Sequence, residues 1–142
     1  MPEFVQTIDI DAAPDVVWPV LAAVEEWPRW TPTVVAAERL DAREFGLGSR
    51  VRIRQPKLPA AVWTVTDWQP GRAFTWENRA PGLLVTAAHR LAPRAGGCRL
   101  ELELVFSGFF AGFVARLARD LNQRYLAQEA QGLKRHCERA AR

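Results

Sequence analysis

The sequence is poor in the residues on which disulfide frameworks, metal sites and many catalytic motifs depend. It holds two cysteines and two histidines in 142 residues. Cys98 and Cys137 are too few and too far apart to predict a disulfide framework, so we expect reduced and largely buried thiols. With His89 and His136 they form no metal motif, because the adjacent His136 and Cys137 would point about 100° apart on a helix. We therefore predict no bound metal and no cofactor.

Motifs for nucleophilic catalysis and nucleotide binding are also missing. The chain contains no GxSxG elbow, and neither cysteine has a histidine in a recognisable catalytic motif. The glycine-rich stretches FGLGSR and PRAGG lack the Walker lysine and the strand-to-helix setting of a dinucleotide loop. Both are typical of hairpin turns.

Long apolar runs and blocks of like charge do not occur either. No window approaches the ~20 apolar residues of a membrane-spanning helix, and the N-terminal MPEFVQTIDI has no basic segment followed by an apolar run. The net charge of +3 is spread along the chain, with arginines next to apolar or acidic residues. These absences predict a cytoplasmic protein with no integral membrane association and no nucleic-acid partner. They leave the oligomeric state open.

The overall composition is that of an ordinary globular protein, with one unusual feature. Hydrophobic residues make up 49% of the chain and charged residues 25%, while tryptophan occurs six times. A chain of this length can bury a core without disulfides or metals. We therefore predict one domain over residues 1–142.

The longest predicted element is an amphipathic helix over residues 109–142. This stretch has no proline, and its polar positions are rich in arginine and glutamine. An isolated helix this polar gains little from propensity alone, so its apolar stripe needs a partner surface. The residues of that stripe are Phe110, Phe113, Val114, Leu117, Leu121, Leu126, Ala130, Leu133 and Cys137.

The rest of the chain supplies that surface as strands. Residues 3–11 alternate as a first strand, and Asp11 with Pro14 then marks the start of a short helix, followed by a helical turn over residues 25–30. From Thr33 onward the apolar pattern has period two, interrupted by turns such as QPGR and APG. Six further strands are predicted at about residues 34–40, 50–55, 61–68, 73–79, 83–92 and 98–106.

Strand parity predicts which face of the sheet meets the helix. In the last strand Arg99 and Glu101 share one parity, while Leu100 and Leu102 share the other. Short connections favour antiparallel neighbours. The predicted class is therefore α+β, a curved antiparallel sheet of about seven strands in the order β-α-α-β6-α, wrapped around a long C-terminal helix.

This order of elements resembles the helix-grip fold of the START-like superfamily, also called SRPBCC. APDVVWPVL with WPRWTP resembles its first helical pair, and VWTVTDWQPGRAFTW its central hairpin. HRLAP and RLELEL resemble its last two strands, and ARLARDLNQRYLAQEAQGLKRHCE its closing helix. The branch labelled polyketide cyclase/dehydrase is the most similar, and the resemblance spans nearly the whole chain. These are mainly core and turn positions, which specify a fold better than a ligand.

The resemblance implies a cavity between sheet and helix that binds an apolar or amphipathic small molecule, such as a lipid, steroid or polyketide. The inward positions mix large residues, such as Trp63, with small ones, such as Ala87, which is consistent with a cavity; a solid aromatic core is the alternative. Gln55, Asn78 and His89 are expected to orient the ligand. The predicted lining residues are Trp30, Ile53, Trp63, Trp76, His89, Phe106, Phe110, Phe113 and Leu117.

Two other functions remain open at this point. His89 lies on the apolar parity of its strand, so it could serve as the acid or base of a polyketide cyclase or dehydratase, although a hydrogen-bonded core histidine is the simpler interpretation. A protein-interaction module would instead need an exposed apolar patch. Leu58 and Pro59, with Trp27 and Trp30, could form one.

Overall fold

The computed structural model describes residues 1–141. Four helical segments are present: α1 (Pro14–Ala22), the 3-10 helix η1 (Val24–Arg29), α2 (Ala111–Leu117) and α3 (Arg119–Ala140). The strands are β1 (Glu3–Ile10), β2 (Ala36–Arg39), β3 (Arg50–Arg54), β4 (Ala61–Gln69), β5 (Ala73–Ala80), β6 (Leu83–Arg94) and β7 (Gly97–Ser107). All seven predicted strands are present, close to the predicted boundaries.

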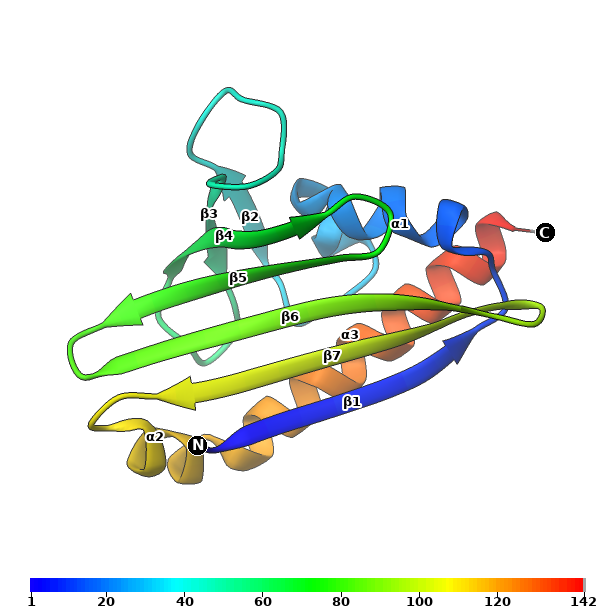
Figure 1. Ribbon diagram of the computed structural model, residues 1–142. Helices are drawn as coiled ribbons and strands as arrows, with labels where there is room; N and C mark the ends of the chain where they lie inside the picture. The colour runs from blue at the N-terminus through cyan, green and yellow to red at the C-terminus, as the bar shows by residue number, and fades with distance from the viewer. Residues whose placement is uncertain (142) are drawn as a thin grey trace.

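The strands form one antiparallel sheet in the order β1-β7-β6-β5-β4-β3-β2 (Figure 1). Strands β2 to β7 are neighbours in sequence order, as their short connections require, and β1 completes the sheet beside β7. Burial follows the predicted parity: in β3, Val51 and Ile53 are buried while the three arginines are exposed. The dry face is therefore the one that side-chain alternation predicts.

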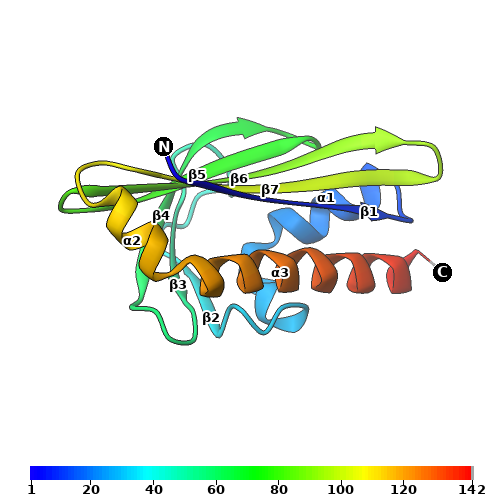
Figure 2. The same cartoon turned by 90° about the horizontal axis from the view of Figure 1, so that it is seen from below.

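The dry face of the sheet curves over α3. Figure 2 shows α3 running beneath the long strands, with β3 and β2 curling down beside it. The pairing of β4 with β5 shifts register between Val65 and Asp67, a bulge of the kind that bends and twists a strand. Helices α1 and η1 cover the same face at the end opposite α2 (Figure 2). This arrangement is the predicted α+β helix-grip fold.

The predicted single C-terminal helix is instead two helices. The chain leaves helical geometry at Ala118, where φ is −102° and ψ is 16°, so the helical phase of α2 is not continued in α3. In α3 the predicted stripe is correct, since Leu126, Ala130, Leu133 and Cys137 are all buried. In α2 it is wrong. The small Ala111 and Ala115 are buried, whereas the predicted Phe110, Phe113 and Leu117 are exposed.

Two further features of the described chain bear on the sequence analysis. Cys98 and Cys137 are free thiols and buried, as predicted. No helix within residues 1–141 combines the length and the apolar composition needed to cross a bilayer.

Candidate functional site

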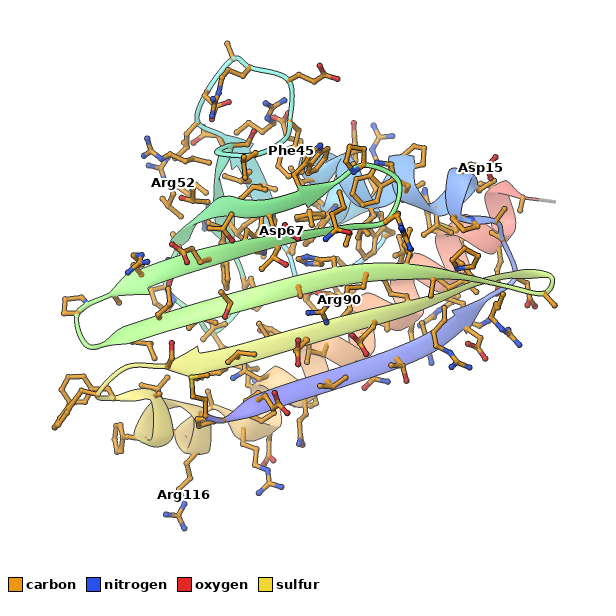
Figure 3. The ribbon with its side chains drawn as sticks, in the orientation of Figure 1. Asp15, Phe45, Arg52, Asp67, Arg90 and Arg116 are labelled. Atoms are coloured by element: carbon orange, nitrogen blue, oxygen red, sulfur yellow. The ribbon has the colours of Figure 1, made fainter. Side chains whose placement is uncertain are left out.

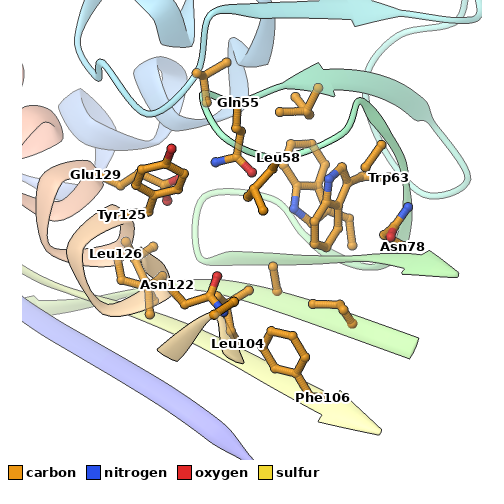
Figure 4. Close-up of a pocket in the computed structure, with 18 of the residues that line it drawn as sticks. Gln55, Leu58, Trp63, Asn78, Leu104, Phe106, Asn122, Tyr125, Leu126 and Glu129 are labelled. Atoms are coloured by element: carbon orange, nitrogen blue, oxygen red, sulfur yellow. The ribbon is translucent and has the colours of Figure 1, made fainter. Parts of the chain in front are cut away.

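A cavity of about 270 Å³ lies between the dry face of the sheet and α3. Figure 4 shows Leu58 and Gln55 on one side of it, Trp63 on another, and Tyr125 on α3 facing them. The cavity extends from buried residues near His89 to partly exposed residues of the β3–β4 loop and α2. Its apolar wall includes Trp27, Val34, Ile53, Trp63, Trp76, Val85, Leu102, Leu104, Phe106 and Leu126.

The structure brings most of the residues that parity placed inward into this cavity. Ile53, Trp63, Trp76, His89 and Phe106 all line it, and so do Gln55 and Asn78. These residues come from β3 to β7, because alternate side chains of neighbouring strands meet on one face.

Trp30 does not line the cavity. It is buried outside it, between Trp27, with ring centroids 5.4 Å apart, and Gly132 of α3. Phe110, Phe113 and Leu117 are absent from the lining as well, and α2 contributes Val114, with Ala118 at its end. Their predicted place in the cavity is therefore corrected. For Phe110, Phe113 and Leu117 the cause is the packing of Ala111 and Ala115 against Val85 and Phe106, which leaves the large side chains exposed to water, and the break at Ala118 separates this orientation from that of α3.

The predicted interaction patch is not formed either. Trp27 and Trp30 are both buried, and Leu58 with Pro59 lies on the cavity lining. The Trp27 indole N–H donates to the carbonyl oxygen of Leu21 at 3.0 Å, which fixes its ring within the core. The two tryptophans of the WPRWTP segment are therefore part of the core, while its prolines and its arginine are exposed.

His89 is a buried imidazole held in one tautomer. Its Nδ1 lies 3.2 Å from the carbonyl oxygen of Phe74, and because a carbonyl can only accept, Nδ1 carries the proton and donates. Its ring stacks on Phe74 with centroids 4.3 Å apart. Burial lowers the pKa of His89 to about 4. Near neutral pH the imidazole is uncharged, and its Nε2 is a hydrogen-bond acceptor available to the cavity.

The opposite side of the cavity carries a polar strip on α3, formed by Asn122, Tyr125 and Glu129 (Figure 4). Spacings of three and four residues place these side chains on one helix face. Tyr125 donates its hydroxyl to the carbonyl oxygen of Pro56, which ties the β3–β4 loop to α3. Asn122 is 8% exposed, and its amide is accessible from the cavity and makes no hydrogen bond within residues 1–141. The amide can therefore hydrogen-bond a ligand or a water in the cavity.

Glu129, like His89, is a titratable residue of the cavity lining. Its Oε1 accepts a hydrogen bond of 3.3 Å from the Thr33 hydroxyl, which lies 2.8 Å from the hydroxyl of Thr31. Burial raises the pKa of Glu129 to about 7, against the lowering effect of that hydrogen bond. The carboxyl can therefore donate as well as accept a proton near neutral pH.

The polar strip was missed in the sequence, although a signal for it exists. Asn122 and Glu129 fall on the same face of α3 as the buried Leu126 and Leu133, where apolar residues are expected. A polar residue at such a position indicates either an internal hydrogen bond or a site. Thr33, which fixes Glu129, is too distant in sequence for any local pattern to pair the two.

His89, which is buried, and Glu129, which is partly buried, predict opposing effects of pH on stability. From about pH 4.5 to about 7 the folded chain holds the Glu129 proton that the unfolded chain has released, so this group destabilises the fold as pH rises. From about pH 4 to about 6.5 His89 acts in the opposite direction, because the folded chain binds its proton less readily. The two contributions partly cancel in the wild type.

Glu129→Gln should remove one of these effects. We expect the variant to gain about 2 kcal/mol of stability relative to the wild type between about pH 5 and about pH 8. Urea unfolding at both pH values measures this, and comparison with the wild type cancels the titration of the other carboxyls. A difference that stays constant with pH would show that Glu129 is not desolvated.

The described residues limit the chemistry available to this site. Within residues 1–141 no three His, Cys, Asp or Glu side chains gather as a metal cluster. Burial raises the pKa of both cysteine thiols, that of Cys137 to about 12, so neither is an activated thiolate. The cavity therefore offers apolar contact, hydrogen bonding and proton transfer at Glu129.

Comparison with known proteins identifies the family. The sequence matches the family model described as polyketide cyclase / dehydrase and lipid transport over residues 1–138. The chain belongs to this family. The predicted resemblance is thus confirmed over nearly the whole chain. No curated protein matches the sequence.

Solved structures of similar fold support the polyketide cyclase/dehydrase assignment at the level of architecture. TTHA0849 from Thermus thermophilus is 20% identical, with a TM-score of 0.78, covering 99% of this chain and 100% of that one. Ara h 8.0201 is 11% identical, with a TM-score of 0.73, covering 96% and 97%. The di-domain ARO/CYC StfQ from the steffimycin biosynthetic pathway is 14% identical, with a TM-score of 0.76 over 98% of this chain. The chain spans about half of StfQ, 51% of its length.

Proposed function

We propose that this protein binds an amphipathic small molecule with a ring-shaped apolar body in the cavity between the sheet and α3. One observation carries the proposal: the same cavity has a wall of indole and phenyl rings and an amide, that of Asn122, that opens onto it and has no partner among residues 1–141. Small-molecule sites combine an apolar lining with a few placed polar groups in this way. Filling the space with apolar side chains alone would leave Asn122 unsatisfied.

The polar groups of the cavity indicate which hydrogen-bonding groups the ligand would carry. Nε2 of His89 accepts a hydrogen bond, the Glu129 carboxyl donates one when protonated, and the Asn122 amide does both. A molecule with hydroxyl and carbonyl groups along one edge fits this arrangement. The volume of about 270 Å³ lies just below the ~300–1,000 Å³ usual for ligand sites, which favours a compact ring system over a long acyl chain.

The comparisons support this ligand class without naming a compound. The family description includes polyketide cyclisation and lipid transport, and StfQ belongs by its title to a steffimycin biosynthetic pathway. Both point toward apolar or aromatic small molecules. Affinity would come mainly from burial of apolar surface, on the order of 25 cal/mol per Å² before the costs of association.

Native mass spectrometry of freshly purified protein tests the proposal directly. A bound compound of defined mass, recovered by solvent extraction, would support it and show the ligand class. Protein that stays free of any compound after exposure to extracts and to a panel of ring compounds would contradict it.

A matched pair of probes tests the polar strip. We expect 2-naphthol to bind more tightly than naphthalene, with quenching of Trp63 and Trp76 fluorescence as the readout. Asn122→Leu should reduce that preference about fivefold, because one buried hydrogen bond contributes about 1 kcal/mol. Gln123→Leu, on the exposed side of the same helix, is the control and should leave the preference unchanged. Equal binding of both probes by the wild type would exclude a polar-edge ligand.

Acid–base catalysis on the bound molecule is the second candidate function, and Glu129 favours it. A proton shuttle at His89 is poorly suited to neutral pH, because its pKa of about 4 makes it a weak base, and its one proton, on Nδ1, is held in the hydrogen bond to the Phe74 carbonyl oxygen. Glu129, with a pKa of about 7, is well matched to that task. The same extraction experiment distinguishes the two functions: a ligand recovered unchanged indicates binding, and one that has lost the mass of a water indicates dehydration.

A further inference from the structure

The surface of α2 exposes large apolar side chains in a way that the rest of the described chain does not. Phe109, Phe110, Phe113 and Leu117 are exposed by 88%, 47%, 69% and 77%. We call these four residues the α2 patch. The other large apolar residues that are exposed, Met1, Val5, Val35 and Leu47, are separated along the chain. Single exposed apolar residues need no explanation, but a cluster of them marks an interaction site.

The orientation of α2 is fixed by packing on its other side. Ala111 and Ala115 pack against Val85 and Phe106, and the Phe110 backbone N–H donates to the carbonyl oxygen of Gly82 at 2.9 Å. The fold therefore buries the small residues of α2 and leaves its large ones in water. The hydrophobic effect favours burial of the large side chains instead. Exposure of the α2 patch to water therefore costs free energy, which a further surface covering the patch would recover.

Positive charge surrounds the α2 patch. Arg116 and Arg119 form no ion pair within residues 1–141, and Figure 3 shows Arg116 projecting from α2 away from the sheet. Residues 109–124 contain one acidic side chain, Asp120, against three arginines. Phenylalanine and leucine next to unpaired arginine are typical of helices that lie in the interface of an anionic membrane.

We propose that the α2 patch docks the protein on the surface of a bilayer that contains anionic lipids. Phe113 and Leu117 would enter the boundary between headgroups and acyl chains, while Arg116 and Arg119 contact lipid phosphates. Docking of this kind is peripheral, in keeping with the lack of a membrane-crossing helix among the described residues.

Size and shape favour a bilayer over a second copy of the chain. The four side chains offer on the order of 500 Å², below the ~800 Å² that each partner buries in a standard protein interface. The α2 helix lies at one end of the molecule (Figures 1 and 2), and Phe113 and Leu117 on it are exposed. A bilayer requires no complementary surface, since each inserted side chain adds to the binding independently.

The α2 helix also borders the cavity, because Val114 and Ala118 line it. A bilayer on the α2 patch would therefore lie next to the partly exposed end of the cavity. The docking proposal rests on the patch alone, so it holds whether or not the cavity binds a ligand.

Vesicle co-sedimentation tests this proposal. The probes are vesicles of phosphatidylcholine alone and of phosphatidylcholine with about one quarter phosphatidylglycerol, at low ionic strength. We expect the wild type to bind the anionic vesicles, and Phe113→Glu/Leu117→Glu to bind at least about tenfold more weakly. Leu47→Glu makes the same apolar-to-acidic change at a site 63% exposed in the β2–β3 loop, and it should bind like the wild type.

The arginines have a separate test. Arg116→Gln/Arg119→Gln should weaken binding to the anionic vesicles about thirtyfold, because each of the two arginines near such a surface contributes about 1 kcal/mol. Circular dichroism melts confirm that each variant is folded. The proposal is overturned if the wild type binds neither kind of vesicle, or if Phe113→Glu/Leu117→Glu binds like the wild type. It is also overturned if vesicle binding is absent and that variant converts a dimer to a monomer in light scattering, since a second copy would then cover the patch.

Discussion

Gly132→Ala should destabilise the protein, although the same change in a helix normally stabilises. Gly132 lies within α3, where alanine is favoured over glycine by about 1 kcal/mol. A Cβ at this position would lie 2.0 Å from the carbonyl oxygen of Trp30, which is far inside van der Waals contact. Because the obstacle is backbone, no side-chain rotation relieves it. We expect a loss of about 3 kcal/mol, the upper part of the usual range for overpacking.

Movement of α3 away from Trp30 cannot easily absorb this clash, since the helix is held on both sides of Gly132. Glu129 accepts from Thr33 at 3.3 Å, and Lys134 donates to the carbonyl oxygen of Asp9 at 2.8 Å. Separating the helix would weaken these bonds and open space around Leu133. The expected loss corresponds to a fall in Tm of roughly 6–12 °C, at about 2–4 °C per kcal/mol for a chain of this size.

Gly112→Ala is the matched control. Gly112 lies in α2, and a Cβ there would meet no atom within 4 Å. The variant should be neutral or more stable by up to about 1 kcal/mol, as helix propensity predicts. Thermal and urea unfolding of both variants give opposite signs if the contact between Trp30 and α3 is as close as described. A stabilised Gly132→Ala variant would show that it is not.

Features of this fold that depend on local periodicity could be predicted from the sequence. The strands follow from alternation, and the inward set Ile53, Trp63, Trp76, His89 and Phe106 follows from strand parity. Turn sequences such as QPGR and APG mark where each strand begins and ends. A one-residue error in assigning the inward parity of one strand therefore does not carry over to the next strand. The family resemblance had the same basis, because its motifs are core and turn positions.

Features that depend on tertiary contacts could not be predicted. Nothing near Ala118 signals a break, since this part of the chain lacks proline and alanine is the best helix former. The phase of α2 is set by Ala111 and Ala115 against the sheet, and small residues carry little weight in an apolar pattern. The pairing of Glu129 with Thr33 spans 96 positions. The cavity's aromatic wall was therefore predicted, while its polar strip and the exposed face of α2 were not.

The cavity exists because aromatic residues are concentrated at one end of the core. Beneath β4 to β6, near α1, the rings of Trp18, Phe45, Trp68 and Phe74 pack in contact. Toward α2 the core is a smaller cluster in which alanines face Val85 and Phe106. The dense end fixes Trp76 and His89, which form the inner wall of the cavity. The rigid aromatic packing near α1 thus holds the inner wall of the cavity in place and keeps the volume toward α2 open.

Phe74→Ala should be among the most destabilising single substitutions in this chain. Phe74 is fully buried, and its ring lies within 6.2 Å, between centroids, of five other rings, those of Trp18, Phe45, Trp68, Trp76 and His89. Removing it forfeits apolar burial and leaves a void that stiff neighbouring rings cannot fill. We expect a loss of about 3–5 kcal/mol, the usual range for truncating a buried phenylalanine, and a fall in Tm of roughly 6–20 °C.

Phe113→Ala makes the same chemical change at a side chain that is 69% exposed, and it should alter stability by no more than about 0.5 kcal/mol. Comparison of Phe74→Ala with Phe113→Ala separates the effect of burial from the effect of losing a phenyl ring. A folded Phe113→Ala variant would also establish that the α2 patch can be altered without loss of the fold.

Phe74→Ala should disturb the cavity as well, because His89 would lose the ring on which it stacks while its hydrogen bond to the residue 74 carbonyl remains possible. Urea unfolding measures both variants. A loss below about 1 kcal/mol for Phe74→Ala would mean that the surrounding rings collapse into the space, and the inner wall of the cavity would then be mobile rather than rigid.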